Sequence, residues 1–187
     1  MSTPFHPALF FTAMILMTAC GEEPISRARV PKTDEPPALA VAPRDMSSSG
    51  PGLRWSMPKG WKEVPGTGMR LATFVPPGGL KTEGTVVSLP GDSGSELANA
   101  NRWRGQIGLP PTDEAGMAAA RTTVAAKIGP VRVYDFTSEG EARTRLIAAV
   151  VSTGDTTWFF KLMGEAGATE SARPGFLAII KGLDAAK

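Results

Sequence analysis

Histidine, cysteine and tyrosine each occur only once in this chain of 187 residues. The single histidine, His6, precedes the single cysteine, Cys20, so the chain after Cys20 contains no histidine. A Ser-His-Asp or Cys-His relay requires these residue types, and so does a zinc site of the usual kind. We therefore expect a non-enzymatic protein with no catalytic residues, no metal and no cofactor.

Charge of one sign is not in excess either. Lys plus Arg number 20 and Asp plus Glu number 18, which gives a formal net charge of +2. So small an imbalance produces no strong steering field, and no block of Lys and Arg alternates with aromatic residues. The composition therefore predicts that nucleic acid is not a partner.

The longest apolar run, residues 8–19, is too short for a membrane-spanning helix, which needs roughly 20 apolar residues. Its length suits the hydrophobic region of a secretory signal. The run ends in Leu16-Met17-Thr18-Ala19-Cys20, the pattern of a lipobox, although Met17 stands where Leu is usual and no Lys or Arg precedes the run. A conventional signal peptide cleaved elsewhere and an uncleaved buried helix are the alternatives.

This segment resembles the signal of bacterial lipoproteins. In that family the cysteine receives fatty acyl chains such as palmitate and becomes the first residue of the mature protein. The resemblance implies a signal peptide at residues 1–19 and lipidation of Cys20. It also implies that a lipid anchor attaches the protein to the cell membrane or the outer membrane, with its domain in the periplasm or outside the cell.

Residues 20–52 are rich in Pro, Ala, Ser and mixed charge, with no apolar period. Such a segment buries too little surface to offset the entropy that ordering costs. We expect a lipidated cysteine followed by a disordered Pro/Ser-rich tether with no binding role of its own. A partner-recognition segment is the alternative.

Residues 53–187 have the pattern of one globular domain. Alternation of apolar and polar residues predicts a strand at 53–57. A turn at 58–60 interrupts this strand, and the strand continues at 61–64. Further strands are predicted at 69–75 and 85–89. Ser93 and Glu96 have the spacing of a capping box and predict a helix to about Gln106. Leu97, Ala100, Trp103 and Ile107 should form its buried stripe.

The rest of the domain is predicted to be rich in strands and to end in a helix. Turn residues separate four antiparallel strands, and the apolar run 146–151 identifies a central strand that is covered on both faces. Thr169 or Ser171 is expected to open the last helix, with Pro174 near its first turn. The expected elements are a short helix at 113–120, strands at 122–128, 131–136, 143–152 and 157–163, and the closing helix.

This order predicts an α+β fold, an antiparallel sheet with flanking helices. Trp55, Pro58, Gly60 and Trp61 resemble the opening of PsbP-like domains, a fold shared with a Ran-binding nuclear import factor and with bacterial periplasmic proteins. Together with residues 101–106 and the last helix, they resemble lipoproteins of that kind. The resemblance implies a PsbP-like α/β/α sandwich over residues 53–187 and brings no catalytic residue with it.

Possible binding residues gather on the first helix and at the opening of the domain. Asn99, Arg102, Arg104 and Gln106 carry amides and guanidinium groups that suit carboxylate or phosphate ligands, yet they can equally satisfy neighbouring acids or loop carbonyls. Trp55 and Trp61 can plug one end of the sandwich or form an exposed hot spot. Trp103 is expected in the core.

These patterns lead to one main interpretation and two alternatives. We expect a membrane-anchored envelope lipoprotein that acts as a non-enzymatic protein-binding or assembly module, with an envelope protein complex as its partner. The first alternative is a small-ligand or anion binder that uses Arg102, Arg104 and the loop around Pro90 to Ser95. A hydrolase that uses paired carboxylates is the second.

Overall fold

The computed structural model describes residues 47–50 and 52–186, which lie within a unit spanning Val41–Lys187. The predicted signal peptide, Cys20 and the tether as far as Met46 lie outside the described residues. The signal peptide, the lipidation of Cys20 and the tether before Ser47 therefore remain predictions from the sequence.

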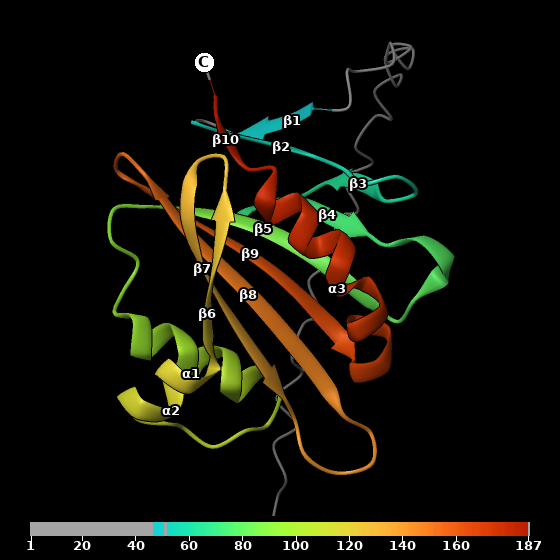
Figure 1. The fold of residues 1–187 in the computed structure, drawn as a ribbon, viewed down its shortest axis with the longest axis vertical. Helices are drawn as coiled ribbons and strands as arrows, with labels where there is room; N and C mark the ends of the chain where they lie inside the picture. Colours follow the sequence, from blue (N-terminus) through green and yellow to red (C-terminus); the bar gives the residue numbers. More distant parts are fainter. Residues whose placement is uncertain (1–46, 51, 187) are drawn as a thin grey trace, which may run out of the picture. The chain divides into compact units, whose positions relative to one another are not determined.

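Seven strands form one antiparallel sheet in the order β3-β4-β5-β9-β8-β7-β6 (Figure 1). The predicted four-strand meander is confirmed as β6 to β9, and β8 is an interior strand, as its apolar run indicates. The strands are β3 (Lys62–Pro65), β4 (Arg70–Val75), β5 (Thr82–Pro90), β6 (Arg121–Ala126), β7 (Gly129–Thr137), β8 (Thr144–Thr153) and β9 (Thr156–Glu165).

Helices pack on both faces of this sheet, because successive side chains of a strand point to opposite faces. On β8, Ile147 and Ala149 belong to the core beneath α3 (Ala166–Lys181). Leu146 and Ala148 belong to a second core beneath α1 (Glu96–Gln106) and α2 (Glu114–Ala120). The predicted α+β sandwich is confirmed.

The last helix begins earlier than expected. Helix α3 starts at Ala166, so Pro174 lies inside the helix and not in its first turn. The prediction of a start at Thr169 or Ser171 is wrong because neither residue caps this helix. The Thr169 hydroxyl is buried and forms a 3.0 Å hydrogen bond with the hydroxyl of Thr82.

A second, three-stranded sheet in the order β1-β2-β10 joins segments from both ends of the described chain. It contains β1 (Ser47–Gly50), β2 (Leu53–Ser56) and β10 (Asp184–Ala185), and a short 3-10 helix, η1 (Pro77–Gly79), lies between β4 and β5. The sequence predicted neither β1 nor β10. The expectation of an unstructured segment as far as Gly52 is wrong for Ser47–Gly50, because strand pairing uses backbone groups and needs no apolar period.

The two halves of the predicted first strand are separate strands. Strand β2 pairs with β1 and β10 in the small sheet, whereas β3 pairs with β4 at the edge of the large one. Between them the chain turns at Gly60, whose φ of 83° favours glycine.

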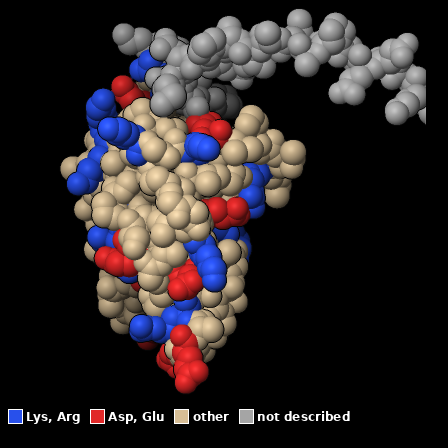
Figure 2. Space-filling model, turned by 90° about the vertical axis from the view of Figure 1, so that its right-hand side faces the viewer, with Lys and Arg blue, Asp and Glu red and all other residues tan. Residues whose placement is uncertain are grey.

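Charges of both signs lie around a largely uncharged area on the surface shown in Figure 2. Within residues 47–50 and 52–186, no helix combines the length and apolar character that crossing a membrane requires.

Candidate functional site: a polar cavity at the start of α1

Helix α1 begins beside the sheet, and Ser95 caps it. The Ser95 hydroxyl accepts a 3.2 Å hydrogen bond from the Ala98 amide, and Ser95 has the extended backbone of an N-cap residue. The prediction that Ser93 and Glu96 form a capping box is therefore wrong. The start of the helix is as expected within the first turn, but the capping residue lies two positions later.

The loop before α1 is held on two sides. Gly91, with φ of 68°, donates its amide to the Asp155 carbonyl at 2.6 Å and accepts a 2.8 Å hydrogen bond from the Thr157 hydroxyl. From the other side, the Asn99 side-chain amide donates to the carbonyls of Ser93 and Gly94 at 3.4 and 3.3 Å. These bonds fix the loop above the ends of β8 and β9.

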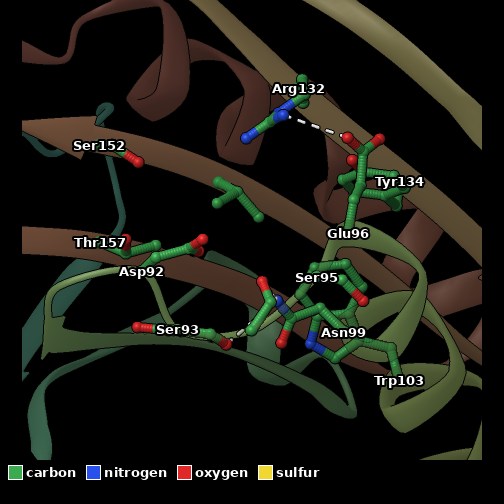
Figure 3. Close-up of a pocket in the computed structure, with 12 residues that line it drawn as sticks. Asp92, Ser93, Ser95, Glu96, Asn99, Trp103, Arg132, Tyr134, Ser152 and Thr157 are labelled. Atoms are coloured by element: carbon green, nitrogen blue, oxygen red, sulfur yellow. Dashed lines mark hydrogen bonds and ion pairs between the residues drawn. The ribbon is translucent and has the colours of Figure 1, made fainter.

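A cavity of about 240 Å³ lies between this loop, α1 and the sheet (Figure 3). Polar side chains dominate its lining, and the Trp103 ring and Val150 supply its apolar part. The lining residues are Asp92, Ser93, Gly94, Ser95, Glu96, Asn99, Trp103, Arg132, Tyr134, Val150, Ser152 and Thr157.

Two hydroxyl groups of this lining are buried without a partner. The Ser93 Oγ and the Tyr134 Oη have no hydrogen-bond partner among the described residues. Tyr134 is 1% exposed and is the only tyrosine of the chain. A buried hydroxyl without a partner costs about 1–3 kcal/mol, so most proteins avoid one. Both oxygen atoms are themselves closed to solvent, so Ser93 and Tyr134 line the cavity with other atoms.

The charges of the cavity are paired with each other. Glu96 accepts hydrogen bonds from Arg121 at 2.7 Å and from Arg132 at 3.1 Å. Burial raises the pKa of the Glu96 carboxyl. The Tyr134 hydroxyl and the two guanidinium groups lower this pKa by more than burial raises it, so it lies below its ordinary value. The Tyr134 hydroxyl faces this carboxylate and interacts with it, although the contact lacks the geometry of a well-formed hydrogen bond. Burial, followed by this interaction with Glu96, raises the pKa of Tyr134.

All four predicted binding residues on α1 make bonds within the protein, and the bonds of Asn99 to the loop are given above. The Arg102 guanidinium donates to Asn99 Oδ1 at 2.9 Å, and the Arg104 Nε donates to the Pro110 carbonyl at 2.8 Å. Gln106 accepts a 2.9 Å hydrogen bond from the Lys161 ammonium. Of the four predicted residues, only Asn99 lines the cavity.

Trp55 and Trp61 are both buried, at 3% and 8% exposure. Trp55 lies in the core between Phe74, Trp158 and Phe160, and its indole nitrogen donates to Glu63 at 2.9 Å. The structure therefore places these two rings where they fill the sandwich. Trp103 is buried as expected, with its ring centroid 5.2 Å from that of Tyr134.

The predicted loop around Pro90 to Ser95 does line the cavity, but sequence reasoning missed Tyr134 and Arg132. Tyr134 and Arg132 lie on β7, and Ser93 lies in the loop before α1, so only the tertiary fold brings them together. The uniqueness of the tyrosine was the one available signal. In the part of the chain that the structure describes, no group of three or more His, Cys, Asp or Glu residues is placed to hold a metal ion.

The sequence matches no model of a protein family and no curated protein. Similarity appears among solved structures. A crystal structure from Bacteroides thetaiotaomicron VPI-5482 is 14% identical with a TM-score of 0.50, over 76% of this chain and 48% of that chain. This chain therefore spans about half the length of that protein.

Two further structures are similar. The cyanobacterial PsbP (CyanoP) of Synechocystis sp. PCC 6803 is 12% identical with a TM-score of 0.50, over 72% of this chain and 87% of that chain. LpqN, described as involved in cell envelope biogenesis of Mycobacterium tuberculosis, is 11% identical with a TM-score of 0.46, over 74% and 87%. At such identities, the similarity to PsbP shows the fold alone. The predicted PsbP-like fold is confirmed.

Proposed function

We propose that this chain is a lipid-anchored protein of the bacterial cell envelope whose folded domain is a non-enzymatic binding module. The lipobox pattern supports acylation of Cys20, and the Pro- and Ser-rich composition after it supports a tether. The domain then faces the periplasm or the outside of the cell. Several acyl chains are needed for stable attachment, because a single one gives only marginal membrane binding.

The cavity at the start of α1 is the observation that carries the binding role. Ligand sites are concave and combine apolar surface with a few polar groups, and this cavity does so with Trp103 and Val150 among polar side chains. The Ser93 hydroxyl contacts no base among the described residues, so nothing there is placed to activate it as a nucleophile. Binding therefore explains the arrangement better than catalysis.

A fragment screen tests the binding role. We expect small polar fragments to shift the amide resonances of the loop 91–95 and of β7 in a chain that begins at residue 20 and carries Cys20→Ser. The same fragments should leave the resonances of the open turn 138–142 unchanged. A screen in which no fragment affects the cavity would remove the binding role from this site.

The lipid anchor has its own test. We expect mass spectrometry of the protein from envelope membranes to find acyl chains on residue 20, and Cys20→Ser to release the protein from those membranes. A Ser26→Ala variant, changed within the same segment, should stay bound. An unmodified thiol at residue 20 would contradict the anchor whatever the cavity binds.

Protein docking is the second candidate function, and the β3–β4 hairpin favours it. Val64, Met69 and Val75 are the large hydrophobic side chains of the described residues that are exposed, and all three lie in or beside this hairpin. Strand β3 is an edge of the large sheet, so its outer backbone groups can pair with an extended apolar segment of a partner protein.

A photo-crosslinker at position 64 tests this docking in envelope membranes. We expect one protein to be captured from position 64 but not from position 139, with capture lost when Val75→Asp is added. Equal capture from both positions would reject the hairpin as a docking surface.

A further inference from the structure

Strand β6 forms an edge of the large sheet that no other strand of the described chain covers (Figure 1). It is the last strand in the order of the sheet and pairs with β7 alone, in a continuous register. Thr122, Thr123 and Ala125 are exposed along it. Proteins commonly protect such an edge with charged residues, a proline or a bulge, and residues 122–126 contain none of these. The edge is therefore open to pairing with an added strand.

The backbone groups that an added strand would meet follow from the pairing with β7. Ala125 lies opposite Pro130, which has no amide hydrogen, so these two residues cannot exchange the two bonds of a hydrogen-bonded pair. Bonded and non-bonded pairs alternate along an antiparallel ladder, so Arg121 and Thr123 also direct their backbone groups away from β7. The Lys127 amide continues this series and donates to a carbonyl of α3 at 3.1 Å. Three residues of β6 therefore present backbone donors and acceptors at the edge.

The two faces beside this edge differ in chemistry. Val124 and Ala126 pack against the core beneath α3, so side chains of an added strand on that face would lie next to apolar residues. On the opposite face, Arg121 donates to Glu96 on α1. Because successive side chains of a strand alternate between the faces, the edge fits a strand with apolar residues towards α3 and polar residues towards α1.

Positive charge is in excess at both ends of β6. At its start, Arg121 and Arg132 share the single carboxylate of Glu96, at 2.7 and 3.1 Å. At its end, Lys127 and Lys181 are exposed, and no carboxylate of residues 52–186 forms an ion pair with either of them. The strand between these ends is uncharged. An added strand with an acidic residue at each end therefore complements this edge.

We propose that β6 binds an extended segment of another protein by strand addition, and that this segment alternates apolar and polar residues between two acidic ends. Main-chain hydrogen bonds supply affinity in this mode of recognition, and the side chains supply specificity. A second copy of this chain fits less well, because antiparallel pairing of two β6 strands brings Arg121 of one copy close to Lys127 of the other. The inference depends neither on the cavity at the start of α1 nor on the β3–β4 hairpin.

A synthetic peptide with capped ends, Glu-Val-Thr-Val-Thr-Val-Glu, is the probe. Paired antiparallel to β6, it places its acidic ends beside Arg121 and Lys127 and its valines on the face of α3. We expect it to shift the amide resonances of residues 121–126 in a chain that begins at residue 20 and carries Cys20→Ser, and to slow hydrogen exchange at Thr123 and Ala125. The same peptide with lysine at both ends should bind about tenfold more weakly, because two attractions become two repulsions.

Variants at one exposed position show whether the edge itself binds. Ala125→Pro removes an outward amide, and proline is tolerated on an edge strand at such a position, so the domain should fold and lose the peptide. Ala125→Ser keeps the amide and is the matched control, with the affinity of the original chain. Lys127→Glu changes only an exposed charge, so it should weaken the acidic peptide several-fold and strengthen the lysine peptide.

Each contrary outcome overturns the proposal. These outcomes are unchanged β6 resonances with the acidic peptide, equal affinity for the two peptides, and equal affinity of Ala125→Pro and Ala125→Ser. If Ala125→Pro fails to fold, the Lys127→Glu comparison decides, and an unchanged preference for the acidic peptide counts against β6. Slow exchange at Thr123 and Ala125 without peptide, together with a dimer in sedimentation, would identify a second copy as the occupant and also overturn the proposal.

Discussion

At the scale of single residues, the cavity at the start of α1 combines committed charges with uncommitted hydroxyls. Glu96 makes two ion pairs, while Ser93 and Tyr134 are buried without partners. Unsatisfied groups of this kind reduce stability.

Tyr134 can be titrated alone, because no other tyrosine contributes. Burial and then the nearby Glu96 carboxylate raise its pKa, so we expect no phenolate absorbance in the folded protein near pH 10, where free tyrosine ionises. The unfolded chain loses this proton at about pH 10 and the folded chain keeps it. The free energy of unfolding should therefore fall as the pH rises above that value.

Two comparisons control this titration. Tyr134→Phe should abolish the phenolate signal completely and remove its share of the decline in stability at high pH. A midpoint at or below pH 10 in the folded protein would show that the phenol is solvated, contrary to its exposure of 1%.

The sequence identified the residue types on α1 but not their targets. Asn99, Arg102 and Arg104 were expected to bind a ligand, and the structure shows them bonded to the loop 93–94, to Asn99 and to Pro110. Arginine has donors for both purposes, and only the fold decides which acceptor lies within reach. Spacing along the helix therefore separated these residues from the apolar stripe, but it did not show that Asn99 is buried or which acceptors the side chains reach.

At the scale of elements, the start of α1 shows how two serines in one loop differ. Ser95 caps the helix through a 3.2 Å bond to Ala98, whereas the Ser93 hydroxyl has no partner. Serine is a favoured N-cap residue at either position. Ser93 lies three residues before Glu96, which is the spacing of a capping box, so the sequence favoured Ser93 as the cap.

Alanine substitution separates the two serines. We expect Ser95→Ala to lower the free energy of unfolding by about 1 kcal/mol, because it exposes an amide that the cap satisfies. Ser93→Ala should be neutral or slightly stabilising, since it removes a hydroxyl without a bond. Chemical denaturation of both variants measures this, and an equal loss in the two would contradict the assignment of Ser95 as the cap.

Pro174 and Gly175 form an unfavourable pair for the interior of α3, and a close contact explains the glycine. A Cβ atom on Gly175 would overlap the Trp61 indole nitrogen. Trp61 is 8% exposed, so its ring has little room to move. The helix therefore approaches Trp61 as closely as only glycine allows.

Gly175→Ala should destabilise the domain for this reason. Alanine is favoured over glycine in a helix by about 1 kcal/mol, but overpacking costs about 1–3 kcal/mol, so we expect a net loss in thermal or chemical unfolding. Gly167→Ala in the same helix is the matched control, because no atom lies within 4 Å of its added Cβ. The control should be neutral or stabilising, and a similar gain for Gly175→Ala would show that Trp61 is free to move.

At the scale of the whole molecule, hydrophobic alternation predicted the large sheet better than the small one. The alternating strands β6 to β9 and the doubly apolar β8 carry their own signal, which the structure confirms. Strands β1 and β10 are short, and β1 contains only Ser and Gly, so their pairing comes from backbone groups that meet only in the folded chain.

The small sheet should contribute measurably to stability, because it ties the C-terminal segment to β2. Asp184 and Ala185 pair with Arg54 and Leu53, and the Ala186 amide donates to the Gly52 carbonyl at 3.3 Å. Each such bond contributes about 0.5–1.5 kcal/mol net, so deletion of residues 184–187 should cost about 2 kcal/mol. For a domain of this size, the melting temperature then falls by several degrees.

A chain that begins at Val41 is the reference for this deletion, because it keeps β1. Asp184→Asn in that chain is the matched control. It removes only a 3.5 Å ion pair between half-exposed groups, so it should change the stability by less than about 1 kcal/mol. If the deletion leaves the melting temperature at that of the reference, the small sheet does not unfold with the core. In that case Leu53, which is fully buried, is held by α3 and the large sheet alone.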